Sequence, residues 1–111
     1  MSPLQIDPGE FRAELSLQEC RTEYDATGGY AEDWVETALV FAKIEPAGAS
    51  SAFGADQTIE TVTHEISLRW RAGLASGMRF VRDGRVFEIR TVHDPDESGR
   101  YLVCGAVEKG A

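Results

Sequence analysis

The side chains that could transfer protons in this chain are its two histidines and the acids beside them. His93 stands directly before Asp94, and such a pair can act in acid–base catalysis. No serine or cysteine in a nucleophile pattern accompanies the pair, so a small hydrolase built on it is not favoured. His64 falls on the apolar face of an alternating segment, which favours a hydrogen-bonded core histidine over a ligand. The residues therefore predict no catalytic site, and we expect the chain not to be an enzyme.

Candidate ion and phosphate sites are also incomplete. Asp94, Asp96 and Glu97 gather in one segment but lack the ligand spacing of a calcium loop, so a solvated turn is favoured. Gly28-Gly29 is not followed by Lys-Ser or Lys-Thr in P-loop spacing. We therefore expect neither a bound metal nor a cofactor.

Length and composition predict one domain covering residues 1–111, because 111 residues lie in the usual single-domain range and 42% are hydrophobic. Cys20 and Cys104 are far apart and not in a metal spacing, which favours two reduced thiols in a protein assembled in the cytoplasm, with a disulfide as the alternative. The opening Met1-Ser2-Pro3-Leu4 does not resemble a signal peptide. No run approaches the ~20 apolar residues of a membrane span, so no membrane contact is expected.

The net charge of −8 disfavours general binding to nucleic acid, because phosphates would be repelled. The charge is also uneven. Residues 1–68 hold 13 acidic and three basic side chains, a net −10, whereas residues 69–111 hold eight basic and six acidic ones, a net +2. One interpretation is an ordinary solvated surface. The other is that an acidic face meets an arginine-bearing face of a neighbouring copy, since the planar guanidinium pairs well with carboxylates.

The second half of the chain predicts an antiparallel meander. Residues 61–71 alternate between apolar and polar side chains, the pattern of a strand with one buried face. Asp83-Gly84 separates the apolar runs 78–81 and 86–92, and Asp-Gly favours a type I′ hairpin turn. A further turn over 94–99 precedes a last strand over 101–107.

The first half is also predicted to be mostly β. Residues 11–18 alternate and predict a first strand, and the turn-rich segment 23–30 predicts a loop. Residues 34–44 predict a long second strand that is apolar on both faces, as in a central strand or one that meets a partner. Residues 47–57 are small and polar, about twice the length of a median connection, and such loops tend to be functional or disordered.

Together these segments predict an all-β fold, a small antiparallel β-barrel of about six strands with a long flexible loop between strands two and three. The interior is expected to be lined by alternating apolar residues from every strand. They are Leu15, Val40, Ile66, Leu68, Phe80, Phe87, Ile89 and Leu102.

Several short motifs, in their order and spacing, resemble the tailed-phage head–tail adaptor proteins, also called head-closure or stopper proteins. The motifs are Pro8-Gly9-Glu10-Phe11-Arg12-Ala13-Glu14-Leu15, Asp25-Ala26-Thr27-Gly28-Gly29 with Trp34, Phe41-Ala42-Lys43-Ile44-Glu45-Pro46, His64-Glu65-Ile66-Ser67-Leu68-Arg69-Trp70-Arg71, Met78-Arg79-Phe80, Gly84-Arg85-Val86-Phe87-Glu88-Ile89 and Leu102-Val103-Cys104. They cover nearly the whole chain. Trp70 stands where the family has Tyr more often, and this change keeps the aromatic packing role.

The resemblance implies a structural subunit of a tailed phage or a gene transfer agent. Such proteins form a ring, here expected to hold six or twelve copies, below the portal or portal-adaptor protein. The ring retains packaged DNA, which it contacts only in passing, and docks the tail through the tail terminator protein. The chain is therefore expected in the virion, at the head–tail connector.

The resemblance also implies which residues contact other molecules. The loop between strands two and three is expected to enter the channel or dock a partner, with Phe53 either anchoring to a neighbour or tucking back onto its own barrel. The loop comprises Ala47, Gly48, Ala49, Ser50, Ser51, Ala52, Phe53, Gly54, Ala55, Asp56 and Gln57. From the uneven charge, and not from the resemblance, we expect Arg69, Arg71 and Arg79 at the interface between subunits.

The alternative function is an oligonucleotide-binding β-barrel, which a small β-meander fold would permit. Such a protein needs aromatic side chains interleaved with basic ones. That platform is only partly supplied, and the net charge opposes it. The residues in question are Arg69, Trp70, Arg71, Arg79 and Phe80.

Overall fold

The computed structural model describes residues 8–47 and 62–109, and these residues form one short 3-10 helix and six strands. The elements are η1 (Pro8–Glu10), β1 (Ala13–Tyr24), β2 (Tyr30–Pro46), β3 (His64–Arg69), β4 (Arg79–Arg82), β5 (Arg85–His93) and β6 (Tyr101–Lys109). Within these described ranges, no helix is long and apolar enough to span a membrane.

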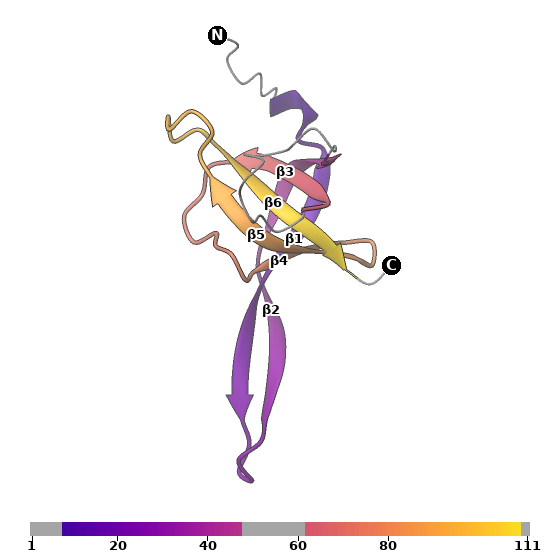
Figure 1. Cartoon of the computed structure of the whole chain (residues 1–111), viewed down its shortest axis with the longest axis vertical. Coiled ribbons are helices and arrows are strands. Elements are labelled where there is room, and N and C mark those ends of the chain that lie inside the picture. The colour runs from indigo at the N-terminus through magenta and orange to yellow at the C-terminus, as the bar shows by residue number, and fades with distance from the viewer. Residues whose placement is uncertain (1–7, 48–61, 110–111) are drawn as a thin grey trace, which may run out of the picture.

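The six strands form one closed antiparallel barrel in the order β1-β2-β3-β6-β5-β4, and β4 returns to pair with β1. This arrangement confirms the predicted all-β barrel of about six strands. The molecule measures 58 × 35 × 27 Å because the far part of the β1–β2 hairpin leaves the barrel and projects away from it (Figure 1).

The core lies inside the barrel and is supplied by alternate residues of every strand. All eight residues predicted to line it are buried, with exposed fractions between 0% and 6%. Leu17, Ala42, Cys104 and Ala106 complete the same cluster. The period-two alternation therefore identified the inward faces correctly, because successive side chains of a strand point to opposite sides of the sheet.

The turns match their sequence signals. Asp83 and Gly84 both have positive φ, 51° and 78°, as a type I′ hairpin requires. In the turn before β6, Glu97 and Gly99 also have positive φ. There the Asp94 carboxylate accepts a hydrogen bond from the Gly99 amide at 2.7 Å. The acidic segment 94–99 is thus organised as a turn by one of its own carboxylates, as expected.

The β1–β2 hairpin is longer than predicted. β1 continues past residue 18 to Tyr24, and β2 begins at Tyr30, so most of the expected loop over 23–30 is strand and a tight turn. The register shifts by one residue between Leu17 and Gln18, and such a bulge bends and twists a strand. We call the part of the hairpin beyond this bulge, residues 18–36, the arm.

The predicted loop over 47–57 falls almost wholly outside the described residues, so its path and the position of Phe53 are not described. Its first residue is described: the Ala47 amide donates a hydrogen bond to the Thr63 carbonyl at 2.8 Å. The segment joining β2 to β3 therefore starts and ends at neighbouring points, where Pro46 pairs with His64 at one end of the barrel.

Candidate interaction surfaces

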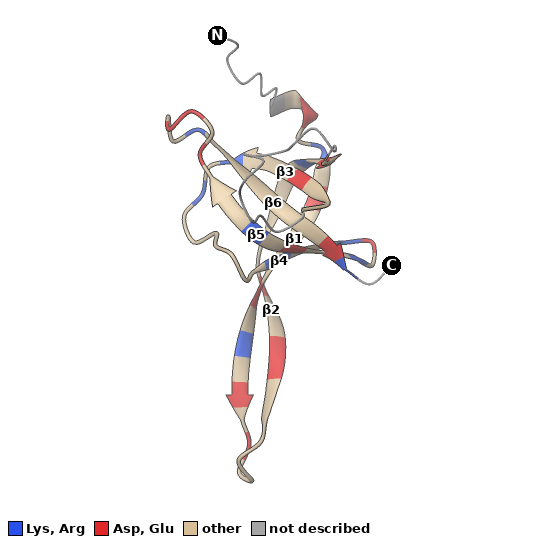
Figure 2. Cartoon of the chain, in the orientation of Figure 1, with Lys and Arg blue, Asp and Glu red and all other residues tan. Residues whose placement is uncertain are grey.

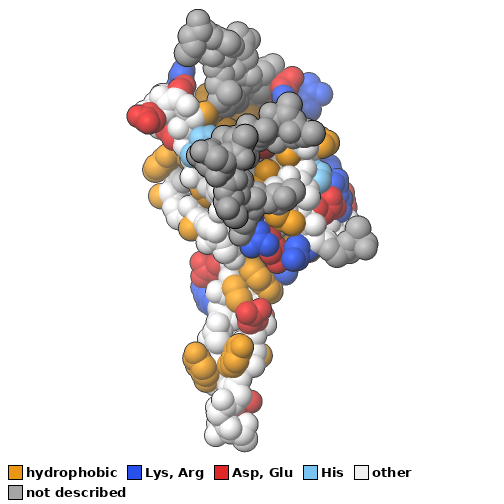
Figure 3. Space-filling view, viewed as in Figure 1, with side chains coloured by type: hydrophobic (Ala, Val, Ile, Leu, Met, Phe, Trp, Pro, Cys, Tyr) orange, Lys and Arg blue, Asp and Glu red, His pale blue; other side chains and the backbone are white. Residues whose placement is uncertain are grey.

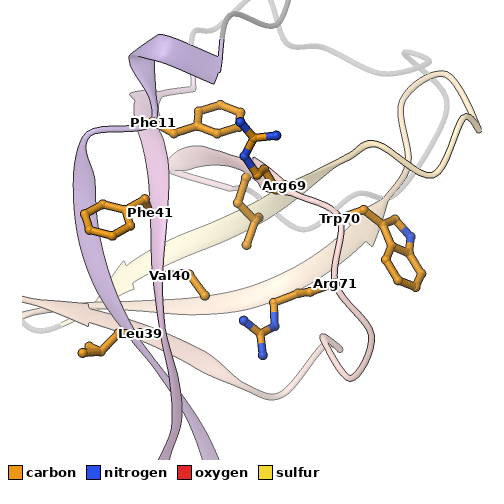
Figure 4. A pocket seen from close by; sticks show the side chains of 8 residues that line it. Phe11, Leu39, Val40, Phe41, Arg69, Trp70 and Arg71 are labelled. Atoms are coloured by element: carbon orange, nitrogen blue, oxygen red, sulfur yellow. The ribbon is translucent and has the colours of Figure 1, made fainter.

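The described surface has a groove where β2 and the end of β3 separate. Ala42 and Leu68 form the last residue pair between these strands in that direction. Beyond this pair, β2 continues alongside β1, while Arg69 pairs with β6. The separation leaves a groove of about 400 Å³, shown in Figure 4. Its walls are Phe11, Leu39, Val40, Phe41, Leu68, Arg69, Trp70 and Arg71.

This groove combines exposed apolar side chains with two arginines. Leu39, Phe41 and Trp70 are 56%, 58% and 49% exposed, high values for large hydrophobic residues. Leu39 and Phe41 belong to β2, and Trp70 lies across the groove from them (Figure 4). They explain why the second strand looked apolar on both faces: Val40 points into the core, while Leu39 and Phe41 lie on the outer face. An outer apolar face is typical of a surface that another molecule covers.

The two arginines of the groove are not neutralised by the rest of the described chain. Neither Arg69 nor Arg71 forms an ion pair with any residue in 8–47 or 62–109. The Nε atom of Arg71 is buried and has no hydrogen-bond partner among the described residues. Buried donors are usually paired, so this guanidinium has capacity to bind an acceptor from another molecule.

The arm carries the opposite charge. Residues 18–36 hold six acidic side chains and one basic one, a net −5, and Figure 2 shows the acidic positions along the hairpin. The one arginine, Arg21, pairs with Glu19 at 3.2 Å. The arm is therefore an acidic hairpin that projects away from the barrel.

The end of the arm is aromatic and well defined. Tyr24 and Tyr30 face each other across the hairpin with ring centroids 6.1 Å apart, and they are 78% and 67% exposed. Hydrophobic side chains can be seen on the arm far from the barrel (Figure 3). The Asp25 carboxylate closes the turn by accepting hydrogen bonds from Thr27 and from the Gly29 amide. These hydrogen bonds lower the pKa of Asp25, the Thr27 hydroxyl contributing most.

Arg79 lies at the base of the arm rather than at the groove. Its guanidinium stacks on the Trp34 ring at 4.1 Å from the centroid. Its Nε donates a 2.8 Å hydrogen bond to the Gln18 side chain. Because Arg79 belongs to β4 and the other two residues belong to the arm, this cluster ties the arm to the barrel. Three arginines were predicted at a subunit interface. Arg69 and Arg71 lie together at the groove, whereas Arg79 lies at the base of the arm and contacts Trp34 and Gln18 of the same chain.

The aromatic and basic residues considered for an oligonucleotide platform do not form one surface. Phe80 is fully buried in the core. Arg79 is engaged with the Trp34 ring at the arm, whereas Arg69 and Trp70 lie at the groove. A single-strand platform needs stacked rings and cations side by side, so the arrangement does not favour that alternative.

The two histidines and Asp94, which were considered for acid–base chemistry, make packing and turn contacts. The His64 ring packs edge-on against Phe87 with centroids 5.1 Å apart. Its Nδ1 lies 2.9 Å from the Thr63 hydroxyl, consistent with the predicted core histidine. His93 is exposed, and the Asp94 carboxylate beside it caps a turn. The described ranges contain no group of three His, Cys, Asp or Glu residues that could hold a metal ion.

Both cysteines are free, as predicted. Cys104 is buried in the core, and burial raises the pKa of its thiol to about 12. Cys20 is half-buried on the arm, where desolvation and the nearby Glu32 carboxylate raise its pKa despite the opposing effect of Arg79. Neither environment activates a thiolate.

A second groove, of about 410 Å³, lies at the other end of β2 and is lined by several basic residues. These cations are mostly paired within the chain. Lys43 contacts Glu10 at 2.7 Å and Glu45 at 3.3 Å, which raises the pKa of its amine. Arg85 forms a two-point contact with Glu108 at 2.8 and 3.1 Å. This groove therefore offers less unneutralised charge than the groove of Arg69 and Arg71.

Sequence reasoning missed the arm and its base. The alternating β-forming residues Thr22, Tyr24 and Tyr30 on both sides of the Asp25 turn are the signal that could have found the longer hairpin. No linear pattern relates Arg79 to Trp34, because they are brought together only by the pairing of β1 with β4 and β2.

Comparison with known proteins assigns the chain to a family. The chain is similar to a chain in a solved structure described as the virion of a native gene transfer agent particle, with 28% identity, 90% of this chain and 96% of that chain covered, and a TM-score of 0.64. It shares its fold with protein SF1141 of Shigella flexneri 2a, known from a solution structure, at 21% identity, 95% and 98% coverage and a TM-score of 0.75. No curated protein matches the chain. The sequence model for the phage head completion protein matches residues 6–109, nearly the whole chain. The chain belongs to the phage head completion protein family.

Proposed function

We propose that the chain is a structural subunit of the head–tail connector of a tailed phage or gene transfer agent. The observation that carries this proposal is the family match over residues 6–109, and the likeness to a chain of a gene transfer agent virion supports it. The chain acts in the virion, between the DNA-filled head and the tail. Its role is mechanical and not enzymatic.

The described surfaces suit such a role. A closed barrel gives a rigid body whose strands pair on both sides, which limits unwanted edge-to-edge association. Onto this body the chain adds an acidic projecting arm and an arginine-bearing apolar groove. Different surfaces on two sides of one subunit are what a head-to-tail ring needs, since each interface then joins one surface to the other.

The further partners follow from this position. The ring consists of copies of this chain, six or twelve in number, with a portal or portal-adaptor protein on the head side and a tail terminator on the tail side. DNA passes through the centre. The segment 47–57 contacts the channel or a partner, and its first residue, Ala47, is attached at one end of the barrel by its hydrogen bond to Thr63.

A deletion experiment on particles tests this function. Particles assembled without the chain should fill with DNA, then lose it and lack tails, as seen by negative-stain microscopy and by nuclease sensitivity of the packaged DNA. Antibody labelling of wild-type particles should mark the head–tail junction. Complete tailed particles that retain DNA without the chain would refute the proposal.

The segment 47–57 is tested separately by deleting residues 48–55. The barrel should stay folded, because the ends of the segment already lie side by side at Ala47 and Thr63 and loop length changes cost little entropy. Particles that carry the shortened chain should then leak DNA or fail to join tails. Normal levels of both DNA and tails would show that the segment only connects β2 to β3.

A further inference from the structure

Beyond its base, the arm is a two-stranded ribbon that pairs with no other strand of the described chain. β4 pairs with β1 only at residues 16–18, and β3 pairs with β2 only at residues 42–46. Beyond these residues the two strands pair only with each other. An isolated two-stranded hairpin is at best marginally stable in water. A long, regular arm of this kind is therefore best explained by a surface that it contacts in the assembled state.

One face of the arm combines aromatic and acidic side chains. Thr22 pairs with Glu32, and Tyr24 pairs with Tyr30, so all four side chains lie on the same face of the ribbon. The two tyrosines are largely exposed. No described residue forms an ion pair with Glu32. This face presents two aromatic rings and one carboxylate without an ion partner among the described residues, with Glu32 about 6.8 Å along the strand from Tyr30.

The groove between β2 and the end of β3 offers the complementary groups. Leu39, Phe41 and Trp70 supply exposed apolar surface, and tyrosine is favoured in contacts of this kind because its ring is apolar and its hydroxyl polar. Arg69 and Arg71 supply two positive charges that form no ion pair with any residue in the described ranges. Within the same ranges the buried Nε of Arg71 finds no acceptor, and a carboxylate is a strong acceptor for a guanidinium.

The arm does not serve its own groove. It runs straight away from the barrel (Figure 1), and its far end lies about 20 Å from residue 18, at ~3.4 Å per residue. The groove lies on the barrel side of the arm's base, at residues 39–41. The end of the arm is therefore available to another molecule, and the groove of a second copy of this chain has the complementary charge and apolar surface.

We propose that the aromatic and acidic face of the arm of one subunit docks in the groove of the next subunit, with Glu32 paired to Arg71. The contact is head-to-tail, so repeating it around a closed rotation generates a ring. This inference rests on the proposed connector function and assigns the surfaces by which its copies recognise one another.

A charge-swap experiment tests the contact. The variants Glu32→Arg and Arg71→Glu are supplied separately, and then as the double variant, to particles that lack the wild-type chain. Each single variant should lower the amount of the chain per particle by about tenfold or more, as expected when a paired charge is replaced by repulsion. The double variant should restore it to near the wild-type level. Glu97→Arg, an equal charge change in the exposed turn before β6, is the matched control and should incorporate normally.

Folding of each purified variant is checked by circular dichroism and thermal melting, because Arg71 is partly buried. If Arg71→Glu does not fold, Arg69→Glu replaces it, since Arg69 is exposed. Single variants that fold and incorporate at the wild-type level overturn the inference. A double variant that remains as defective as the singles also overturns the pairing.

A photo-cross-linking amino acid at Tyr30 gives an independent result. In assembled particles it should link to the peptide containing residues 69–71 of another copy. A link to a different virion protein would overturn the arm-to-groove contact and leave the connector function intact. Absence of the wild-type chain from the head–tail junction would instead overturn the proposed function itself, so the two failures are distinguishable.

Discussion

Replacing Arg79 by alanine should loosen the arm without unfolding the barrel. The change removes the guanidinium–ring contact with Trp34, worth roughly 0.5–2 kcal/mol at a partly exposed site. It also removes the hydrogen bond to Gln18, worth about 0.5–1.5 kcal/mol. A combined loss of about 2 kcal/mol would raise the fraction of opened arm roughly 30-fold. The core residues make no contact that this substitution removes.

Native-state hydrogen exchange can measure this effect residue by residue. Amides that bond across the arm, in 19–24 and 30–35, should exchange roughly 30-fold faster in Arg79→Ala, because their exchange follows local opening. Amides of β3 and β6 should keep their rates. Arg82→Ala is the matched control, since Arg82 also lies in β4 and its ion pair with Asp83 is long, at 4.0 Å, and exposed. Unchanged arm amides, or equal acceleration throughout the barrel, would refute the role given to Arg79.

Three further outcomes are expected. Phe87→Ala should destabilise the fold by about 3–5 kcal/mol, because Phe87 is fully buried against His64; a denaturant midpoint equal to that of the wild type would remove it from the core. Arg85 lowers the pKa of Glu108 from its usual 4.5, so the pair stabilises the fold above that pH and the contribution is lost as pH falls through the lowered value. Glu108→Gln should therefore lower the denaturant midpoint at neutral pH, and the difference from the wild type should vanish once the pH falls below the lowered pKa of Glu108; a difference independent of pH would contradict this. The purified chain should bind short DNA weakly or not at all at physiological salt, since its net charge is −8; tight, salt-sensitive binding in a titration would favour the oligonucleotide-binding alternative.

The barrel was predictable because its strands have one face in the core. Ile66 and Leu68 alternate with Glu65 and Ser67, and this period reports directly which side chains point inward. The Asp83-Gly84 turn was predictable for a similarly local reason, since positive φ at both positions selects those residue types. Where burial or backbone geometry restricts the residue type at each position, the structure can be predicted from the sequence pattern.

The arm escaped prediction because it has no core to constrain it. From residue 18 to residue 24 β1 carries few large apolar side chains on either face, so its alternation of Thr22 and Tyr24 with charged residues does not mark a buried face. For the groove, the sequence indicated only one wall, through the apolar residues Leu39 and Phe41 on the second face of β2. Its second wall comes from Arg69, the last residue of β3, and from Arg71 just beyond it, and their position follows from the register between β2 and β3, which no linear pattern states.

Closure of the barrel explains why the interaction surfaces lie where they do. Within the barrel each strand finds partners on both sides, so few backbone groups remain for other molecules. The exceptions are the arm, whose outer edges have no strand beside them, and the stretch of β2 at residues 39–41, where β3 has already separated. Both surfaces carry exposed aromatic or aliphatic side chains; the arm is acidic, whereas Arg69 and Arg71 beside the β2 stretch are basic. In the arm-to-groove contact proposed above, the arm of one subunit meets the groove of its neighbour, and a closed ring is the assembly in which every arm and every groove would be used.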